Sequence, residues 1–348
     1  MHLKRTVLWI FAIIALAAAV FFLGWEEIKG ILLQANPYVL AVLCLLQVGT
    51  LAMSAYMWHF LMRKLAPGYS FGRVFAVYLG GNFVESITPA AKMGGEAARI
   101  YLFRRLTSLP YTKLAGVLLV HKYISLLPFV LLCTFMLPLS LFLLKLPPFF
   151  IPAFIALIGL FAAVVILLRA RHSSHSKGKK SSSSELPEWQ QKWNRVFLFL
   201  KDAASQARTL TTRREQLVLL AISLCVWALY PLKVYLVATM LGLRVDMVVA
   251  AMATYSAYMI SMIPLLPGGL GTFEGSMAFI FAFSGLAPAA GLAIALLTRL
   301  VTYWFSLLLT AVAAATLALG NNPLPGAAGR PDSLRGPPEG NGWVATEN

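Results

Sequence analysis

The sequence contains little charge and little cysteine. Asp and Glu together number 13 in 348 residues, charged residues make up 12%, and there are three cysteines. Cys44, Cys133 and Cys225 fall inside apolar runs without metal-ligand spacing, so they indicate neither a disulfide framework nor a zinc site. The sequence also has no P-loop and no nucleophile with a plausible base. We therefore expect no metal, no cofactor and no catalytic residue.

Apolar residues dominate what is present. They make up 59% of the chain, and the mean hydropathy is +0.76. Soluble domains are not this apolar, and several runs reach the ~20 residues that cross ~30 Å of hydrocarbon. We predict an all-α polytopic membrane protein with about six full transmembrane helices and two re-entrant helical hairpins, arranged as inverted repeats. The apolar runs cover residues 7–23, 38–58, 74–88, 114–144, 149–168, 217–241, 247–266, 276–287 and 289–318.

A polar segment divides these runs into two groups. Residues 169–216 are serine-rich and basic, which is typical of a linker. The sequence therefore predicts a first membrane repeat over 1–168, the linker over 169–216, and a second membrane repeat over 217–320. The Gly- and Pro-rich tail over 321–348 is expected to be disordered.

The net charge of +16 comes mainly from short loops. Most of the 29 Lys and Arg lie at the N-terminus and in 59–73, 92–113 and 169–216. By the positive-inside rule, the N-terminus and the 169–216 loop are predicted to be cytoplasmic in a multi-pass protein of the cell membrane. Membrane lipids explain such basic loops, so no nucleic-acid partner is expected. Basic residues flank 74–91 on both sides, so this segment must enter and leave from the cytoplasmic face.

Two apolar segments are interrupted by proline, paired glycines and a glutamate. They read "ESITPAAKMGGEAAR" over 85–99 and "ISMIPLLPGGLGTFE" over 260–274. Such residues unwind a helix, and unpaired backbone groups at membrane depth are tolerated only inside protein or beside a watery cavity. Paired breaks in two halves are typical of a transporter's substrate site, where half-helix N-termini attract anions such as phosphate. The alternative is that these glycines and prolines only permit close packing or a kink.

Ionisable residues inside apolar segments are costly and indicate function. Glu96 and Arg99 are three apart on a helix, so they share a face and can pair. Arg99 is also the cation best suited to a phosphate group, because guanidinium binds phosphate through two hydrogen bonds. Lys122 is expected to extend to the membrane interface rather than bind anything.

In the second half, Glu274 needs a cationic partner. Arg299 is the expected partner and Lys233 the alternative, and each pair can equally be a structural salt bridge. The predicted substrate-binding residues are Asn82, Glu85, Pro89, Gly94, Gly95, Glu96, Arg99, Pro267, Gly268, Gly269, Gly271, Glu274 and Arg299.

The motifs "PAAKMGGEAARIYLFRR" (89–105) and "PLLPGGLGTFE" (264–274) carry a family resemblance. The chain resembles, over about residues 5–318, the flippase-like membrane domain of lysylphosphatidylglycerol synthases. That domain forms the N-terminal half of the multiple peptide resistance factor and also occurs alone. The resemblance implies movement of aminoacylated phosphatidylglycerol to the outer leaflet, while a separate soluble domain transfers lysine from lysyl-tRNA. Too few residues follow 318 for that domain, so we expect a stand-alone member without it.

Three functions are compatible with this sequence. The first is translocation between leaflets of a phosphate-containing phospholipid, aminoacylated or not, or of a polyprenyl lipid. The second is phosphatidylglycerol lysyltransferase activity, as the family name implies, with a role in resistance to cationic peptide antibiotics. The third is a non-transporting partner that binds a separate lipid synthase or glycosyltransferase through the 169–216 loop. Membrane lipids are the expected partners, joined in the third case by a lipid-modifying enzyme.

Overall fold

The computed structural model describes residues 25–88, 93–145, 150–169, 198–199, 202–207, 209–262 and 267–319. Within these residues every element is helical, which confirms the predicted all-α fold class. The predicted first run, 7–23, lies outside them. The elements are α2 (Trp25–Leu32), α3 (Pro37–Leu65), α4 (Phe71–Ile87), α5 (Met93–Thr107), α6 (Tyr111–Leu143), α7 (Phe150–Arg169), α9 (Arg213–Met240), α10 (Met247–Ser261), η1 (Pro267–Gly269), α11 (Thr272–Phe283), α12 (Pro288–Arg299), η2 (Leu300–Phe305) and α13 (Ser306–Leu319).

Four stretches of helix in the described residues are long and apolar enough to cross a membrane. They are Pro37–Leu65, Tyr111–Leu143, Arg213–Met240 and Pro288–Leu317, with mean hydropathy of 1.8 or more. Large apolar side chains lie on their outer surfaces: Leu45 is 70% exposed, Phe135 67% and Leu308 69%. Lipid solvates such surfaces favourably and water does not. The chain is therefore a polytopic membrane protein, and the number of six spans stays a prediction because 7–23 is not described.

The ends of these long helices carry clear sequence signals. α3 begins with Pro37 after an Asn36 cap, whose side chain accepts a hydrogen bond of 2.9 Å from the Tyr38 amide. α9 begins with a capping box in which Thr212 and Glu215 each bond to the other's backbone amide. α9 thus starts inside the segment predicted to be linker. Residues 202–207 just before it are also helical, and the Ala203 carbonyl lies close against Gly116 of α6.

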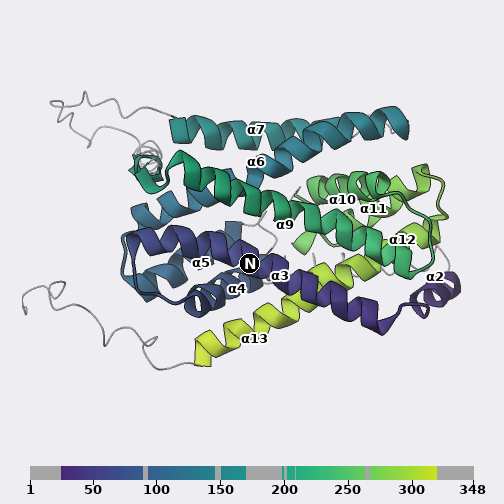
Figure 1. Ribbon diagram of the computed structural model, residues 1–348, viewed down its shortest axis with the longest axis horizontal. Coiled ribbons are helices and arrows are strands. Elements are labelled where there is room, and N and C mark those ends of the chain that lie inside the picture. Colours follow the sequence, from purple (N-terminus) through teal and green to yellow (C-terminus); the bar gives the residue numbers. More distant parts are fainter. Residues whose placement is uncertain are drawn as a thin grey trace, which may run out of the picture.

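Two helical hairpins are too short to cross the membrane. α4, α5, α10 and α11 have 17, 15, 15 and 12 residues. At ~1.5 Å per residue the longest spans only ~25 Å, which is less than the ~30 Å of a hydrocarbon core. α4 packs on α5 and α10 packs on α11. In Figure 1 the long helices run roughly from left to right, the first hairpin lies toward the left-hand end and the second toward the right-hand end.

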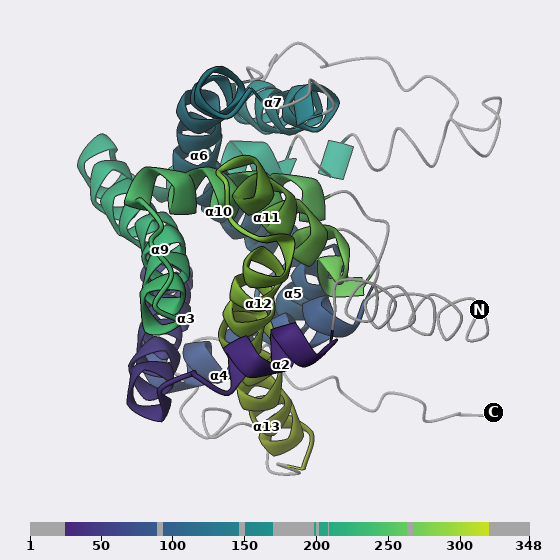
Figure 2. The same cartoon turned by 90° about the vertical axis from the view of Figure 1, so that its right-hand side faces the viewer.

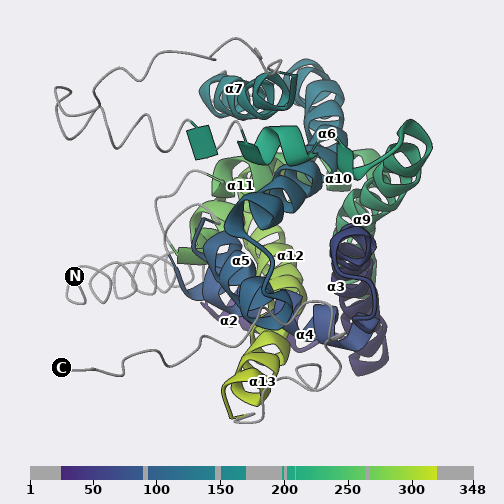
Figure 3. The ribbon, with the colours of Figure 1, turned by 90° about the vertical axis from the view of Figure 1, so that its left-hand side faces the viewer.

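The last span connects the two hairpins. α12 packs on α11, α13 packs on α4, and the six-residue π-helix η2 lies between α12 and α13. Figure 2 faces the end that carries α10, α11 and α12, and Figure 3 faces the opposite end, with α4 and α5. The π-helix therefore lies where the two hairpins approach each other. Irregular π turns inside helices are common at functional sites.

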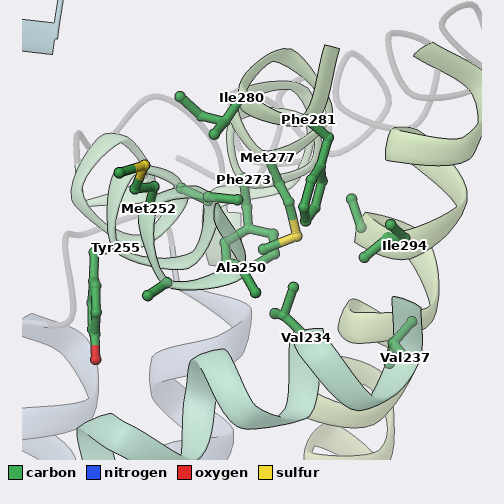
Figure 4. Packing of buried hydrophobic residues seen from close by; sticks show 14 of the residues in the cluster. Val234, Val237, Ala250, Met252, Tyr255, Phe273, Met277, Ile280, Phe281 and Ile294 are labelled. Atoms are coloured by element: carbon green, nitrogen blue, oxygen red, sulfur yellow. The ribbon is translucent and has the colours of Figure 1, made fainter. Parts of the chain in front are cut away.

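Two apolar cores fix the hairpins to the long helices. In one, Phe273, Met277 and Phe281 of α11 pack with Ile294 of α12 and Val234 of α9, as Figure 4 shows. In the other, residues of α3, α4, α5 and α6 come together. There the Trp58 and Phe103 rings stack at 5.1 Å, and neither side chain is exposed. Each hairpin thus has its own packed support, so its helices are held in a defined position.

Candidate functional site

An ion cluster joins the two helices of the first hairpin. Arg99 of α5, whose side chain is 4% exposed, donates to Asn82 and to Glu85 of α4, the latter at 2.5 Å. A second guanidinium nitrogen lies 3.1 Å from Glu96 Oε1, which confirms the predicted Glu96–Arg99 pair. The central carbon of the same guanidinium lies 5.0 Å from the centre of the Tyr78 ring. Arg99 therefore joins α4 to α5, the two arms of the hairpin.

Lys122 completes this cluster, so the prediction that it binds nothing was wrong. Its Nζ lies 2.5 Å from Glu96 Oε1, where it pairs from α6. The physical reason is charge balance. Glu85 and Glu96 both lie within ion-pair distance of the single Arg99 guanidinium, and Lys122 balances the second negative charge. Lys122 and Tyr78 are the members of the cluster that the sequence pattern missed.

The paired glycines of the first break allow a close helix contact. A Cβ on Gly95 would lie 2.5 Å from Glu85 Cβ and 2.8 Å from the Gly81 carbonyl oxygen, so α4 and α5 touch there through backbone. A Cβ on Gly94 would likewise collide with Thr88. Both glycines lie in the first turn of α5. The interpretation that the glycines permit close packing thus holds at these two positions. The predicted site residue Pro89 lies outside the described residues.

The second break is an irregular loop closed by a buried ion pair. Gly268, Gly269 and Gly271 have φ of 63°, 66° and 78°, which side-chain-bearing residues rarely adopt. Arg299 donates from Nε to Glu274 Oε1 at 2.8 Å and from Nη2 to the Gly268 carbonyl at 2.5 Å. Glu274 Oε2 accepts from the Gly271 amide at 2.7 Å. The expected Glu274–Arg299 pair is confirmed, and it ties the unwound backbone to the last span.

Aromatic rings enclose this pair. The Arg299 guanidinium centre lies 4.7 Å from the Phe273 ring centre and 4.6 Å from that of Tyr303. Tyr258 of α10 packs on Phe273 with ring centres 5.1 Å apart. Aromatic rings attract a cation that is removed from water, so the Phe273 and Tyr303 rings stabilise the Arg299 guanidinium. The predicted site residue Pro267 is the first residue of η1, in the same loop.

Tyr303 brings the two breaks together. Its hydroxyl donates to the Ser86 carbonyl, at the end of α4, with a distance of 3.1 Å. Its ring also covers Gly268, where a Cβ would lie 2.5 Å from Tyr303 Cε2. η1 itself packs on α4. The two broken hairpins therefore meet at one tyrosine of the π-helix, which the sequence did not single out.

Lys233 is not the partner of Glu274. Its Nζ lies 2.5 Å from Gln47 Oε1 and 3.1 Å from Thr50 Oγ1, both on α3. It also lies 4.3 Å from the centre of the Tyr230 ring. The described part of the chain thus holds three buried cations, Arg99, Lys233 and Arg299, and each lies against a tyrosine ring.

These features define a class of protein: an all-helical polytopic membrane protein in which two broken hairpins meet around buried charges. Comparison with known proteins gives the family. The chain belongs to the family described as lysylphosphatidylglycerol synthase TM region, whose model matches residues 8–310. This confirms the resemblance carried by the two glycine-rich motifs.

The relatives found are archaeal proteins described as UPF0104 membrane proteins. One from Methanothermobacter thermautotrophicus is 24% identical over 315 residues, which cover 86% of this chain and 92% of the relative. One from Methanocaldococcus jannaschii is 24% identical over 311 residues, covering 86% and 91%. One from Pyrococcus horikoshii is 20% identical over 332 residues, covering 88% and 95%. The similarity thus extends over nearly the whole length of each relative.

Proposed function

We propose that this protein translocates a phosphate-bearing lipid between the two leaflets of the cell membrane. The observation that carries the proposal is the meeting of the two broken hairpins at Tyr303, which contacts both Ser86 and Gly268. Each hairpin is too short to cross a bilayer, and the two lie toward opposite ends of the long helices. Two half-depth hairpins that meet in the middle leave one barrier between the two sides, as alternating access requires.

The buried charges give this central barrier its affinity for a headgroup. Glu274 and Arg299 of the second break and Glu96 and Arg99 of the first are buried, and buried charges in a membrane protein are retained for function at considerable cost. The substrate would exchange partners with them. Its phosphate would bind Arg99 and the half-helix ends near Gly94–Gly95 and Gly268–Gly269. A cationic group on an aminoacylated lipid would bind Glu96 or Glu274.

The orientation follows from the basic loops. With the N-terminus and the 169–216 loop in the cytoplasm, the first hairpin opens to the cytoplasm and the second to the outside. Opening of the Glu274–Arg299 pair would then open this central barrier to the outside, and opening of the Arg99 cluster would open it to the cytoplasm. Because the pair and the cluster are each neutral overall when closed, the closed barrier exposes no net charge to lipid.

A vesicle assay tests the proposal. The purified protein is reconstituted in phosphatidylcholine–phosphatidylglycerol vesicles that contain fluorescent phosphatidylglycerol, and an impermeant reductant bleaches the outer leaflet. Wild type should make the inner-leaflet probe accessible, and a Glu274→Gln, Arg99→Ala double variant should not. Lys64→Gln is the control, because it breaks the more exposed Lys64–Glu215 pair between α3 and α9. Equal rates for wild type, double variant and protein-free vesicles would overturn the proposal.

The lysyltransferase alternative is tested with the same preparation. Phosphatidylglycerol vesicles that contain the protein are supplied with lysyl-tRNA, and the lipids are separated by mass. Formation of lysylphosphatidylglycerol would establish the enzyme activity, whereas translocation without it would assign transport alone to this chain.

A further inference from the structure

Lys233 is the buried cation that stands apart from the two ion pairs. It lies on α9 and is 1% exposed. Its Nζ donates to Gln47 Oε1 and Thr50 Oγ1 and lies over the Tyr230 ring. Every one of these partners is uncharged.

The other buried cations of the described chain are neutralised. Arg99 has Glu85 and Glu96 within ion-pair distance, and Arg299 has Glu274. In the part of the chain that the structure describes, no carboxylate pairs with Lys233. A lone buried charge is costly, and replacement of such a group by an apolar one often stabilises a protein. A purely structural strut between α3 and α9 does not need this charge.

The groups around Lys233 form a set that suits an anion. The Thr50 hydroxyl now donates to the Leu46 carbonyl, and Gln47 Nε2 donates to Ser306 Oγ at 2.8 Å. Two hydroxyls, an amide NH2 and an ammonium can all turn their hydrogens toward an oxyanion. Because no described carboxylate pairs with Lys233, an incoming phosphate would be attracted to its ammonium group, whereas a metal ion or cationic group would be repelled.

The set also lies beside the junction of the hairpins. Ser306 directly follows the π-helix that contains Tyr303. On the other side, the Tyr230 and Tyr258 rings are 4.8 Å apart, and Tyr258 packs on Phe273 beneath Arg299. The Tyr230, Tyr258 and Phe273 rings thus form a continuous series of contacts between Lys233 and Arg299.

We propose that Lys233, with Gln47, Thr50 and Ser306, is a second anion site for the phosphodiester of the translocated lipid, in addition to Arg99 and the half-helix ends. This rests on the proposed function and deepens it, because it assigns phosphate recognition to a residue outside both glycine-rich motifs. In the closed arrangement the four side chains satisfy one another. When a lipid enters, phosphodiester oxygens replace Gln47 Oε1 and Thr50 Oγ1 as the acceptors of the Lys233 hydrogens.

Thermal unfolding in a neutral detergent tests this site. Wild type, Lys233→Met, Lys233→Arg and the exposed control Lys64→Met are melted with phosphatidylglycerol, with diacylglycerol of the same chains, or with inorganic phosphate. Phosphatidylglycerol should raise the Tm of wild type, Lys233→Arg and Lys64→Met by about 3 °C or more, since ligand binding stabilises the folded state. Lys233→Met without lipid should melt at or above the wild-type temperature and show no shift with lipid.

Three results would overturn the assignment. The first is a Lys233→Met protein that melts well below wild type yet keeps its phosphatidylglycerol shift, as a structural strut predicts. The second is an equal shift with diacylglycerol, which carries no phosphate. The third is a Lys233-dependent shift with inorganic phosphate but none with the lipid, which would indicate a free ion as ligand. Should Lys233→Met not fold, Thr50→Ala with Ser306→Ala must reduce the shift, because it removes two donors and keeps the charge.

This test is separate from the vesicle assay. A Lys233-dependent shift in a protein that moves no lipid would leave the anion site standing and remove the transport proposal. Wild-type translocation by Lys233→Met with an unchanged shift would remove the anion site alone.

Discussion

The Tyr303 hydroxyl donates a 3.1 Å hydrogen bond to the carbonyl of Ser86, a residue 217 positions earlier in the chain. Ser86 lies near the end of α4, where helix carbonyls have no partner within the helix. The same tyrosine ring covers Gly268 in the second break. One side chain of the last span thus holds both broken hairpins in their closed arrangement.

Loss of this hydrogen bond should loosen the first hairpin. Tyr303→Phe keeps the ring beside Arg299 but leaves the Ser86 carbonyl unpaired, which should cost about 1–3 kcal/mol and speed amide exchange over residues 82–88. Hydrogen–deuterium exchange measures this. Tyr56→Phe is the control, because Tyr56 is 44% exposed. Exchange over 82–88 identical to wild type would show that Tyr303 does not hold the tip.

Alanine in place of glycine should affect stability differently in the broken loop and in a regular helix. Gly268→Ala forces a Cβ into a residue with φ of 63° and against the Tyr303 ring, so the melting temperature should fall by several degrees. Gly275→Ala is the matched control: it lies in α11, where a Cβ meets nothing within 4 Å, and should leave stability unchanged or raise it by about 0.5–1 kcal/mol. Equal melting temperatures for the two variants would contradict the loop geometry.

The Glu274–Arg299 pair should show strong coupling. Glu274→Gln leaves the Arg299 charge buried without a carboxylate, which should cost about 3–5 kcal/mol. Adding Arg299→Met to it should recover much of this stability, since the unpaired charge is gone, but should not restore translocation. Thermal melts and the vesicle assay on the same samples measure both effects. If the double variant moves lipid at the wild-type rate, the pair is a structural salt bridge only.

Local signals in the sequence predicted much of this arrangement. Proline, paired glycines and an acid marked both hairpins, and spacing along one helix predicted Glu96 with Arg99. The contacts made by Lys122, Tyr303 and Lys233 were not predictable in this way, because their partners lie on other helices. In a membrane span almost every position is apolar, so periodicity does not tell which face of α6 or α9 meets a neighbour. The close approach at Gly81, which lies against the Arg99 side chain, was missed for the same reason.

Cysteine labelling tests the central claim, that the two hairpins enter from opposite sides of the membrane. Cys44, Cys133 and Cys225 are replaced by alanine, and single cysteines are placed at Gly72, near the start of α4, or at Ala287, after α11. Both positions are exposed, so a membrane-impermeant maleimide can reach them. Intact cells should label the cysteine at 287, and the one at 72 should react only after the membrane is opened. Labelling of both from the same side would contradict the inverted arrangement on which the transport proposal depends.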